Sequence, residues 1–420
     1  MMLIINILPL VLIVVLLFKR KHMLFAGVCG GVLAMIIGKM TVGDATGIFL
    51  GGVSNMLGIT VPILYAATAA MVAKGGSIQS LVELSKRGLK GKISILAGIM
   101  VLIQAFATYM AGMGAGNTMV TAPLIAIAVG AVPEVIAGMA IATAVGFTTS
   151  PASTETALAA ESAGREIAAH AAAMRPFTIL FFLLAAGLAM YGVYKRGGLT
   201  IKETVATKDG SIEEKEDTTT LWKKAIPSLA LLIMVVGGSK INSLIGISIF
   251  SPATTIIFTS ILTVIFTPLN INKTSEALVD GSRFILTTLF SVGIFLGFIN
   301  MIAELGTFEQ IAAIAGNAPQ MIVVPVAMII AFLIAIPAGA FCAGVLTLVL
   351  PTLAALGLPS EAMGFVAIAA GLGTQVSPVQ INVAALAEGF DMDIMDVIKE
   401  NIKFIISAMV ILVILAVIIV

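Results

Sequence analysis

The hydropathy pattern divides the chain into long apolar segments separated by short polar connections. Many segments reach or approach about 18 residues, the length of α-helix that crosses a hydrocarbon layer of ~30 Å. The pattern therefore predicts an all-α polytopic membrane protein with about ten crossings. The segments fall at about 2–18, 23–39, 57–73, 93–110, 133–150, 174–194, 225–238, 246–267, 287–303, 320–337, 360–376 and 402–420.

Composition supports a membrane protein and excludes several classes of function. Of the 420 residues, 59% are hydrophobic and 11% are charged, too few charges for the polar shell of a water-soluble enzyme. We therefore expect no enzyme. The net charge of +1 predicts no binding of nucleic acid. Two cysteines and two histidines, without the spacing of metal ligands, predict no resident metal and no other cofactor.

Segments far apart in the sequence are related to each other. The run TTSPASTETALAAE at 148–161 matches QVSPVQINVAALAE at 375–388 when 227 is added to each residue number. Upstream, MVAKGGS at 71–77 matches MIAELGT at 301–307 with a shift of 230. A register kept over so long a stretch predicts two structural repeats, joined by the one long polar segment of the chain.

Each repeat is expected to contain a re-entrant hairpin and a broken helix. The hairpin tips are rich in glycine, and the Ser-Pro pairs interrupt helices because proline removes a backbone donor and clashes with the preceding turn. Backbone carbonyls freed in hydrocarbon need polar partners. The predicted units are 1–195 (first repeat, with a hairpin at about 93–130 and a broken helix at about 133–161), 196–224 (cytoplasmic linker) and 225–420 (second repeat, with a hairpin at about 320–357 and a broken helix at about 360–388).

The positive charges predict the orientation in the membrane. Five crossings per repeat is an odd number, so the second repeat would be inverted relative to the first. With both termini outside, the predicted cytoplasmic segments carry 19 of the 23 Lys and Arg residues, as the positive-inside rule requires. The four remaining basic residues are Lys39, Arg165, Arg175 and Lys240.

The motifs resemble those of the ion transporter superfamily. The run GLGTQVSPVQINVAALAEGFDMDIMDVIKEN at 371–401, the run TSPASTETALAAESA at 149–163 and the Gly-Asn-Thr at 116–118 are similar to segments of anaerobic C4-dicarboxylate carriers and their gluconate- and citrate-permease relatives. The resemblance implies a homodimer in the cytoplasmic membrane of a prokaryote, moving carboxylates with Na⁺ or H⁺ by an elevator-like mechanism. The second tip, AGAFCAG at 338–344, departs from the family because it lacks the Asn-Thr pair.

Neutral polar residues gather at the breaks and the first tip. Together with helix N-termini, they could bind a carboxylate without an arginine. Alternatively, they only form hydrogen bonds with backbone groups that the helix breaks leave unpaired. An acid in a membrane segment is a functional candidate, so Glu155 is predicted to hold Na⁺ or to carry a proton, unless it is hydrated near the outer surface. The candidate substrate-binding residues are Gly116, Asn117, Thr118, Thr149, Ser150, Gly344, Gln375, Ser377, Gln380 and Asn382. The candidate ion-coupling residues are Thr148, Ser153, Thr154, Glu155 and Thr374.

The leading prediction for function is a secondary active transporter of a small organic anion, coupled to Na⁺ or H⁺. Inverted repeats with broken helices at mid-membrane are typical of such transporters. The alternatives are a Na⁺/H⁺ antiporter, a cation-coupled amino-acid transporter and an ion channel, although no charged ring or filter motif supports the channel. The expected partners are a small-molecule substrate, the lipid bilayer and a second copy of the chain.

Overall fold

The structure, a computed structural model, describes residues 2–19, 21–57, 60–89, 92–112, 114–197, 217–320, 322–339 and 342–420. These ranges contain α-helices and no β-strand, which confirms the expected all-α class. Most of the predicted linker, residues 198–216, lies outside the described residues.

Ten helices precede the linker, and each predicted apolar segment of this half coincides with one of them. They are α1 (Met2–Phe18), α2 (Met23–Gly38), α3 (Val42–Leu57), α4 (Thr60–Lys74), α5 (Ser77–Gly88), α6 (Ile93–Ala111), α7 (Ala115–Val129), α8 (Pro133–Thr149), α9 (Thr154–Ser162) and α10 (Ile167–Lys195).

Ten further helices follow the linker. The first begins before the expected residue 225, because Asp217 caps its N-terminus by accepting a hydrogen bond of 3.2 Å from the Thr219 backbone. The helices are α11 (Thr218–Ile245), α12 (Pro252–Phe266), α13 (Ile271–Gly281), α14 (Arg283–Ala303), α15 (Thr307–Gly316), α16 (Val323–Ala335), α17 (Cys342–Ala355), α18 (Ser360–Thr374), α19 (Ile381–Gly389) and α20 (Ile394–Ile419).

Several helices have the length and composition of membrane spans. Among the described residues, α6, α10 and α20 are each long and apolar enough to cross a bilayer. The pair α8 and α9, bent by 51°, and the pair α14 and α15, bent by 63°, pass the same test as broken segments. Further apolar helices are shorter than a span. These are the features of a helical membrane protein.

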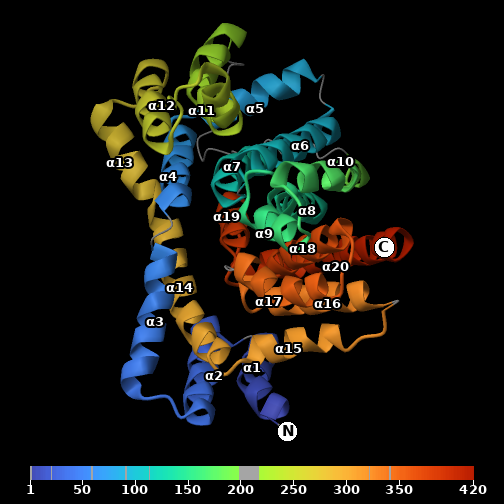
Figure 1. The fold of residues 1–420 in the computed structure, drawn as a ribbon. Coiled ribbons are helices and arrows are strands. Elements are labelled where there is room, and N and C mark those ends of the chain that lie inside the picture. The colour runs from blue at the N-terminus through green and yellow to red at the C-terminus, as the bar shows by residue number, and fades with distance from the viewer. Residues whose placement is uncertain are drawn as a thin grey trace.

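The helices form two groups that lie side by side (Figure 1). One group contains α1–α4 and α11–α14, and the other contains α6–α10 and α16–α20. The short helices α5 and α15 connect the groups: α5 packs against α11 and α7, and α15 packs against α1 and α17. Within the second group, α7, α8 and α9 pack against α19, α18 and α17, respectively.

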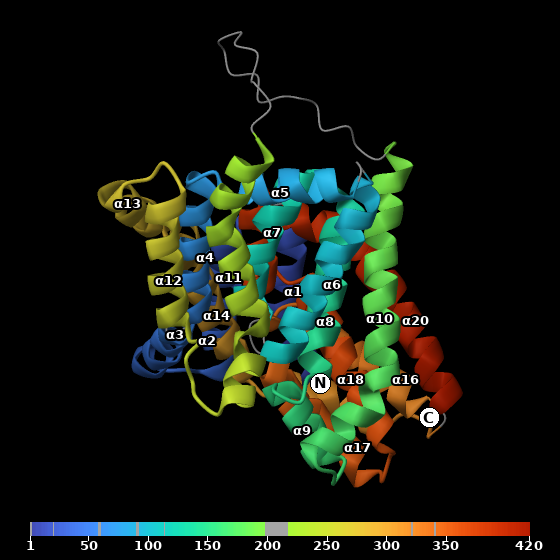
Figure 2. The same ribbon diagram turned by 90° about the horizontal axis from the view of Figure 1, so that it is seen from above.

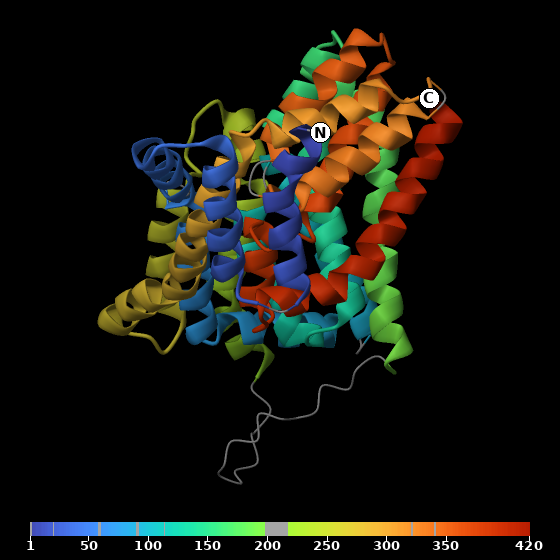
Figure 3. The same cartoon turned by 90° about the horizontal axis from the view of Figure 1, so that it is seen from below.

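The helix ends that flank the linker and the chain termini lie in opposite halves of the molecule (Figures 2 and 3). The ends of α10 and α11 that flank residues 198–216 lie at one end, together with α5 and α13. Both chain termini lie in the opposite half. The ends of α10 and α11 are therefore separated from the termini along the long direction of the helices.

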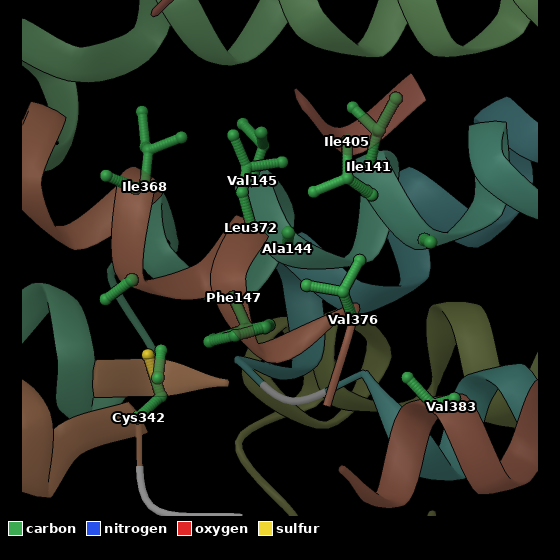
Figure 4. Close-up of a cluster of buried hydrophobic side chains, with 14 of the residues drawn as sticks. Ile141, Ala144, Val145, Phe147, Cys342, Ile368, Leu372, Val376, Val383 and Ile405 are labelled. Atoms are coloured by element: carbon green, nitrogen blue, oxygen red, sulfur yellow. The ribbon is translucent and has the colours of Figure 1, made fainter. Parts of the chain in front are cut away.

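The core of the second group is the crossing of α8 and α18. All residues of α8 from Glu134 to Thr149 are buried, so this helix is enclosed on every side. A methyl group on Gly371 of α18 would lie 2.6 Å from Thr148 Cγ2, so the glycine permits the close approach. Figure 4 shows Ala144 and Val145 of α8 beside Leu372 of α18 in this core.

Glycines also allow α8 and α18 to approach their other neighbours. A methyl group on Gly146 of α8 would lie 2.9 Å from Thr108 Cγ2 of α6. On α18, a methyl group on Gly373 would lie 2.3 Å from the carbonyl oxygen of Phe332 in α16. Each helix thus packs tightly against the first arm of one predicted hairpin, α6 or α16.

Candidate functional site

The first predicted break lies between α8 and α9. Helix α8 ends at Thr149, Ser150 has extended backbone, and α9 begins at Thr154. Ser153 caps α9 because its hydroxyl accepts a hydrogen bond of 3.1 Å from the Thr156 backbone. The backbone is therefore interrupted at the Ser-Pro pair, where the sequence predicts it.

The hydroxyl groups of this first break bond mainly to the backbone. Thr148 donates to the carbonyl of Ala144, and Thr149 donates to that of Val145, each at 2.7 Å. Ser150 Oγ donates to the carbonyl oxygen of Tyr109 in α6 at 2.5 Å. These contacts match the alternative in which the hydroxyls re-satisfy broken backbone.

The second break, between α18 and α19, is organised by amide side chains. Helix α18 ends at Thr374, and α19 begins at Ile381. Asn382 Nδ2 donates to Gln375 Oε1 at 2.7 Å, and Gln375 Nε2 donates to Thr374 Oγ1 at 2.9 Å. Thr374 in turn donates to the carbonyl oxygen of Gly371 at 2.6 Å. All three side chains are buried.

A second polar cluster lies where α6 and α7 meet α8, and its central residue is Gln104 of α6. The sequence did not single out this residue. Gln104 Nε2 donates to Thr118 Oγ1 at 2.6 Å and to Thr143 Oγ1 at 3.1 Å. Its Oε1 accepts from Thr121 Oγ1 at 2.5 Å. Gln104 and Thr108 are four residues apart on one face of α6, and this spacing was the available signal.

One hydrogen bond joins the two clusters: Thr118 Oγ1 of α7 donates to Asn382 Oδ1 of α19 at 2.5 Å. A single direction of donation then runs through the whole set, taking the shortest contact of each hydroxyl. Thr121 donates to Gln104, Gln104 to Thr118, and so on until Thr374 donates to a backbone carbonyl. We call these six side chains the amide network: Gln104, Thr118, Thr121, Thr374, Gln375 and Asn382.

The direction of the amide network determines which groups it leaves unused. The side-chain oxygens of Asn382 and Gln375 both accept a hydrogen bond. Each amide nitrogen carries two hydrogens, and each nitrogen donates one hydrogen bond to an acceptor among the described residues. One N–H of Asn382 and one N–H of Gln375 therefore stay available as donors.

The hairpin tips lie against the breaks. Gly112, at the end of α6, has a left-handed backbone with φ of 71°, and a methyl group on it would lie 2.4 Å from the carbonyl oxygen of Ala152. A methyl group on Gly339, just after α16, would lie 2.2 Å from Ser377 Oγ. The tip of the first hairpin thus lies on the first break, and that of the second hairpin on the second break.

Glu155 lies in the first turn of α9, where the helix N-terminus favours a negative charge. Its residue is partly buried, and no salt bridge involves it among the described residues. Helix α9 packs against α17, which is apolar except for hydroxyl groups. A carboxylate here therefore lacks a basic partner.

The structure brings together some of the predicted site residues and separates others. Thr118, Gln375, Asn382 and Thr374 meet in the amide network. The Gly-Asn-Thr run is not a non-helical tip, because α7 already begins at Ala115, so Gly116 and Asn117 lie in its first turn. Thr148, Thr149, Ser150 and Ser153 bond locally at the first break, and Thr154 is exposed. Ser377 is buried beside Gly339, Gly344 lies in α17, and Gln380 precedes α19.

Ion pairs lie at the starts of α8 and α18. Glu134, at the start of α8, pairs with Arg196 at 2.6 Å, and Glu361, at the start of α18, lies 4.0 Å from Arg165. Among the described residues, no three His, Cys, Asp or Glu side chains are placed to hold a metal ion together. The amide network itself consists of neutral polar side chains.

Comparisons with known proteins add no assignment. No protein-family model and no curated protein matches this chain. The chemistry of the amide network and of Glu155 therefore carries the functional argument.

Proposed function

We propose that the protein is a secondary transporter that moves a small carboxylate across the membrane together with Na⁺ or H⁺. The observation that carries the proposal is the pair of unused N–H donors on Asn382 and Gln375. These two side chains are hydrogen-bonded to each other, so the donors lie close together. Two neighbouring N–H groups suit the two oxygens of a carboxylate, and they need no basic residue.

The donors favour an organic anion over the alternative functions. A Na⁺/H⁺ antiporter binds cations, for which several oxygen acceptors are needed, and each side-chain oxygen here already accepts one hydrogen bond from a neighbouring side chain. In this structure Asn382 and Gln375 are buried, so a substrate reaches them only after α7 and α19 separate. Such a movement is what alternating access requires.

Packing supports an arrangement of two related repeats. Gly146 approaches Ala105 and Thr108, and Gly373 approaches Phe332 and Ala335. Each residue of the second set has the number of its counterpart plus 227, the shift that relates the two Ser-Pro segments. The tip glycines Gly112 and Gly339 also differ by 227.

The connections between the two helix groups support the same arrangement. Ser77, the first residue of α5, bonds to Ser228 of α11 at 3.0 Å. Thr307, the first residue of α15, donates to the carbonyl oxygen of Asn6 in α1 at 2.9 Å. Ser77 and Thr307 differ by 230, the shift found upstream in the sequence. We infer that α1–α10 and α11–α20 are the two repeats.

The inferred orientation places both termini outside and the linker in the cytoplasm. The support is the excess of Lys and Arg in the segments at the linker end of the molecule. Cysteines placed singly at Thr207 and at the exposed Ile247, with Cys29 and Cys342 replaced, should react with an impermeant thiol reagent from opposite sides. Reaction of both from the same side would contradict the inverted arrangement.

Uptake into proteoliposomes tests the proposed substrate class. Radiolabelled succinate, citrate, gluconate and amino acids are offered with Na⁺ and pH gradients imposed separately. Asn382→Asp replaces the donor with a negative charge, and like charges in a buried site cost several kcal/mol, so carboxylate uptake should fall roughly 100-fold or more. Asn317→Asp, on an exposed residue after α15, is the control and should leave uptake unchanged. Full carboxylate uptake by Asn382→Asp would refute the site.

A further inference from the structure

Glu388 is a half-buried acid that the amide network does not use. It lies in the last turn of α19, the helix that carries Asn382 near its start. Its Oε2 is buried and has no hydrogen-bond partner among the described residues. The next residue, Gly389, is so close to α7 that a methyl group on it would lie 2.3 Å from Ala122 Cβ. One carboxyl oxygen of Glu388 is therefore buried without a partner on a helix that packs closely against α7.

In the part of the chain that the structure describes, the helices packed against α19 supply no counter-charge to Glu388. These helices are α7, α8, α14 and α20. Helix α7 has no charged residue, Glu134 of α8 pairs with Arg196, and Arg283 of α14 pairs with Asp280. On α20, Lys399 pairs with Asp396, Lys403 lies over the ring of Phe404, and the remaining charged residue is the acid Glu400.

The backbone around Glu388 also disfavours a negative charge. The C-terminus of a helix carries a partial negative charge from its unpaired carbonyl groups. Asp391, a further acid, follows three residues later, and its backbone N–H donates to the carbonyl oxygen of Glu388 at 3.2 Å. A carboxylate at this position needs a bound cation to be neutral.

We propose that Glu388 is a proton-binding site. A proton fits better than Na⁺, because Na⁺ needs several oxygen ligands and no second side chain among the described residues bonds to this carboxyl group. Water supplies the proton, an O–H bond forms on the carboxylate, and the reverse step returns the proton to water. Because Asn382 lies on the same short helix, the role in transport rests on the proposed function.

The chain offers a matched control for Glu388. Subtracting 227 gives Glu161, which occupies the last turn of α9 and is exposed. The two acids thus have the same place in their helices and differ in burial. Glu161→Gln removes a hydrated carboxylate, whereas Glu388→Gln removes the half-buried one.

Infrared difference spectroscopy of the purified protein in lipid tests proton binding without any substrate. Titration across neutral pH should show the C=O stretch of a protonated carboxyl group in wild-type protein and in Glu161→Gln. Glu388→Gln should lose this band, and Glu388→Asp should restore it at a shifted frequency. A band that is unchanged in Glu388→Gln, or no such band in wild-type protein, would overturn the proposal.

Succinate uptake then tests the link to transport separately. An imposed pH gradient should alter the uptake rate of wild-type protein and of Glu161→Gln several-fold, and Glu388→Gln should show a response at least threefold smaller. If the infrared band behaves as expected while no variant transports a carboxylate, the proton site stands and the proposed substrate class fails. An equal pH response in Glu388→Gln would overturn the coupling role.

Discussion

The two breaks share a position in their helices and differ in the chemistry around them. At the first break, Thr148 and Thr149 bond to their own helix. At the second break, Gln375 and Asn382 reach across to the first hairpin. The side chains that face them in that hairpin are polar, whereas the corresponding residues of the second hairpin are apolar: Gln104, Thr118 and Thr121 correspond to Ala331, Val345 and Leu348.

Two breaks at related positions in the sequence can therefore be surrounded by different polar side chains. Adding 227 to Glu155 gives Asn382, so an acid at one break stands where the other has an amide. The amide belongs to a network of donors, and the acid lies beside the apolar helix α17. We therefore expect the second break to recognise the substrate and the first break to respond to the cation.

The largest expected effect is at Glu155. Glu155→Gln keeps the size of the side chain and removes its charge, so a cation loses its partner at the first break. Accumulation of succinate driven by a Na⁺ or pH gradient should fall to the level seen without a gradient, while exchange of internal for external succinate continues. Wild-type gradient dependence in this variant would show that Glu155 is a hydrated acid, and the division between the breaks would be wrong.

A smaller effect is expected at Gln104. Gln104→Leu removes the donor to Thr118 and the acceptor of Thr121, and these hydroxyls keep only their other bonds, to Asn382 and to the carbonyl oxygen of Asn117. The two lost hydrogen bonds together cost ~1–3 kcal/mol. Because Thr118 then no longer positions Asn382, the KM for succinate uptake in proteoliposomes should rise roughly 10- to 100-fold. Gln79→Leu, on an exposed residue of α5, serves as the control. An unchanged KM would show that the amide network does not orient Asn382.

The smallest effect on transport is expected at Ser150. Its hydroxyl donates to the Tyr109 carbonyl and accepts from the Ala152 backbone at 3.0 Å. Ser150→Ala should lower the free energy of unfolding by about 1–3 kcal/mol, detected as a lower Tm in detergent, and should leave the KM for succinate within about twofold of wild type. A large change in KM with an unchanged Tm would place substrate contacts at the first break as well.

The sequence was sufficient to predict most of the helices, because each apolar run is bounded by charged residues, glycine or proline. The interruptions at Ser150 and Ser377 followed from the adjacent prolines. Residues whose role depends on packing were not predictable. Gln104 and Thr143 are single polar residues in apolar runs, and only the contact between α6, α7 and α8 makes them partners.

The same limit applies at the first break. Thr148 and Ser153 are predicted to meet an ion because a broken helix exposes carbonyl groups. The structure shows instead that a hydroxyl can bond to its own helix or to the nearest turn. Hydropathy and spacing do not distinguish these two outcomes, since both place the same residue beside the same proline.

The single hydrogen bond between Thr118 and Asn382 has a consequence for how the chain assembles in the bilayer. The two residues are 264 positions apart, so their contact forms only after nearly the whole protein has been synthesised. The bond of Thr118 to Gln104 and that of Asn382 to Gln375 each lie within one half of the chain, so they do not depend on the other half. Each half can therefore pair these polar side chains in the bilayer by itself, and the complete amide network forms only when the two halves meet.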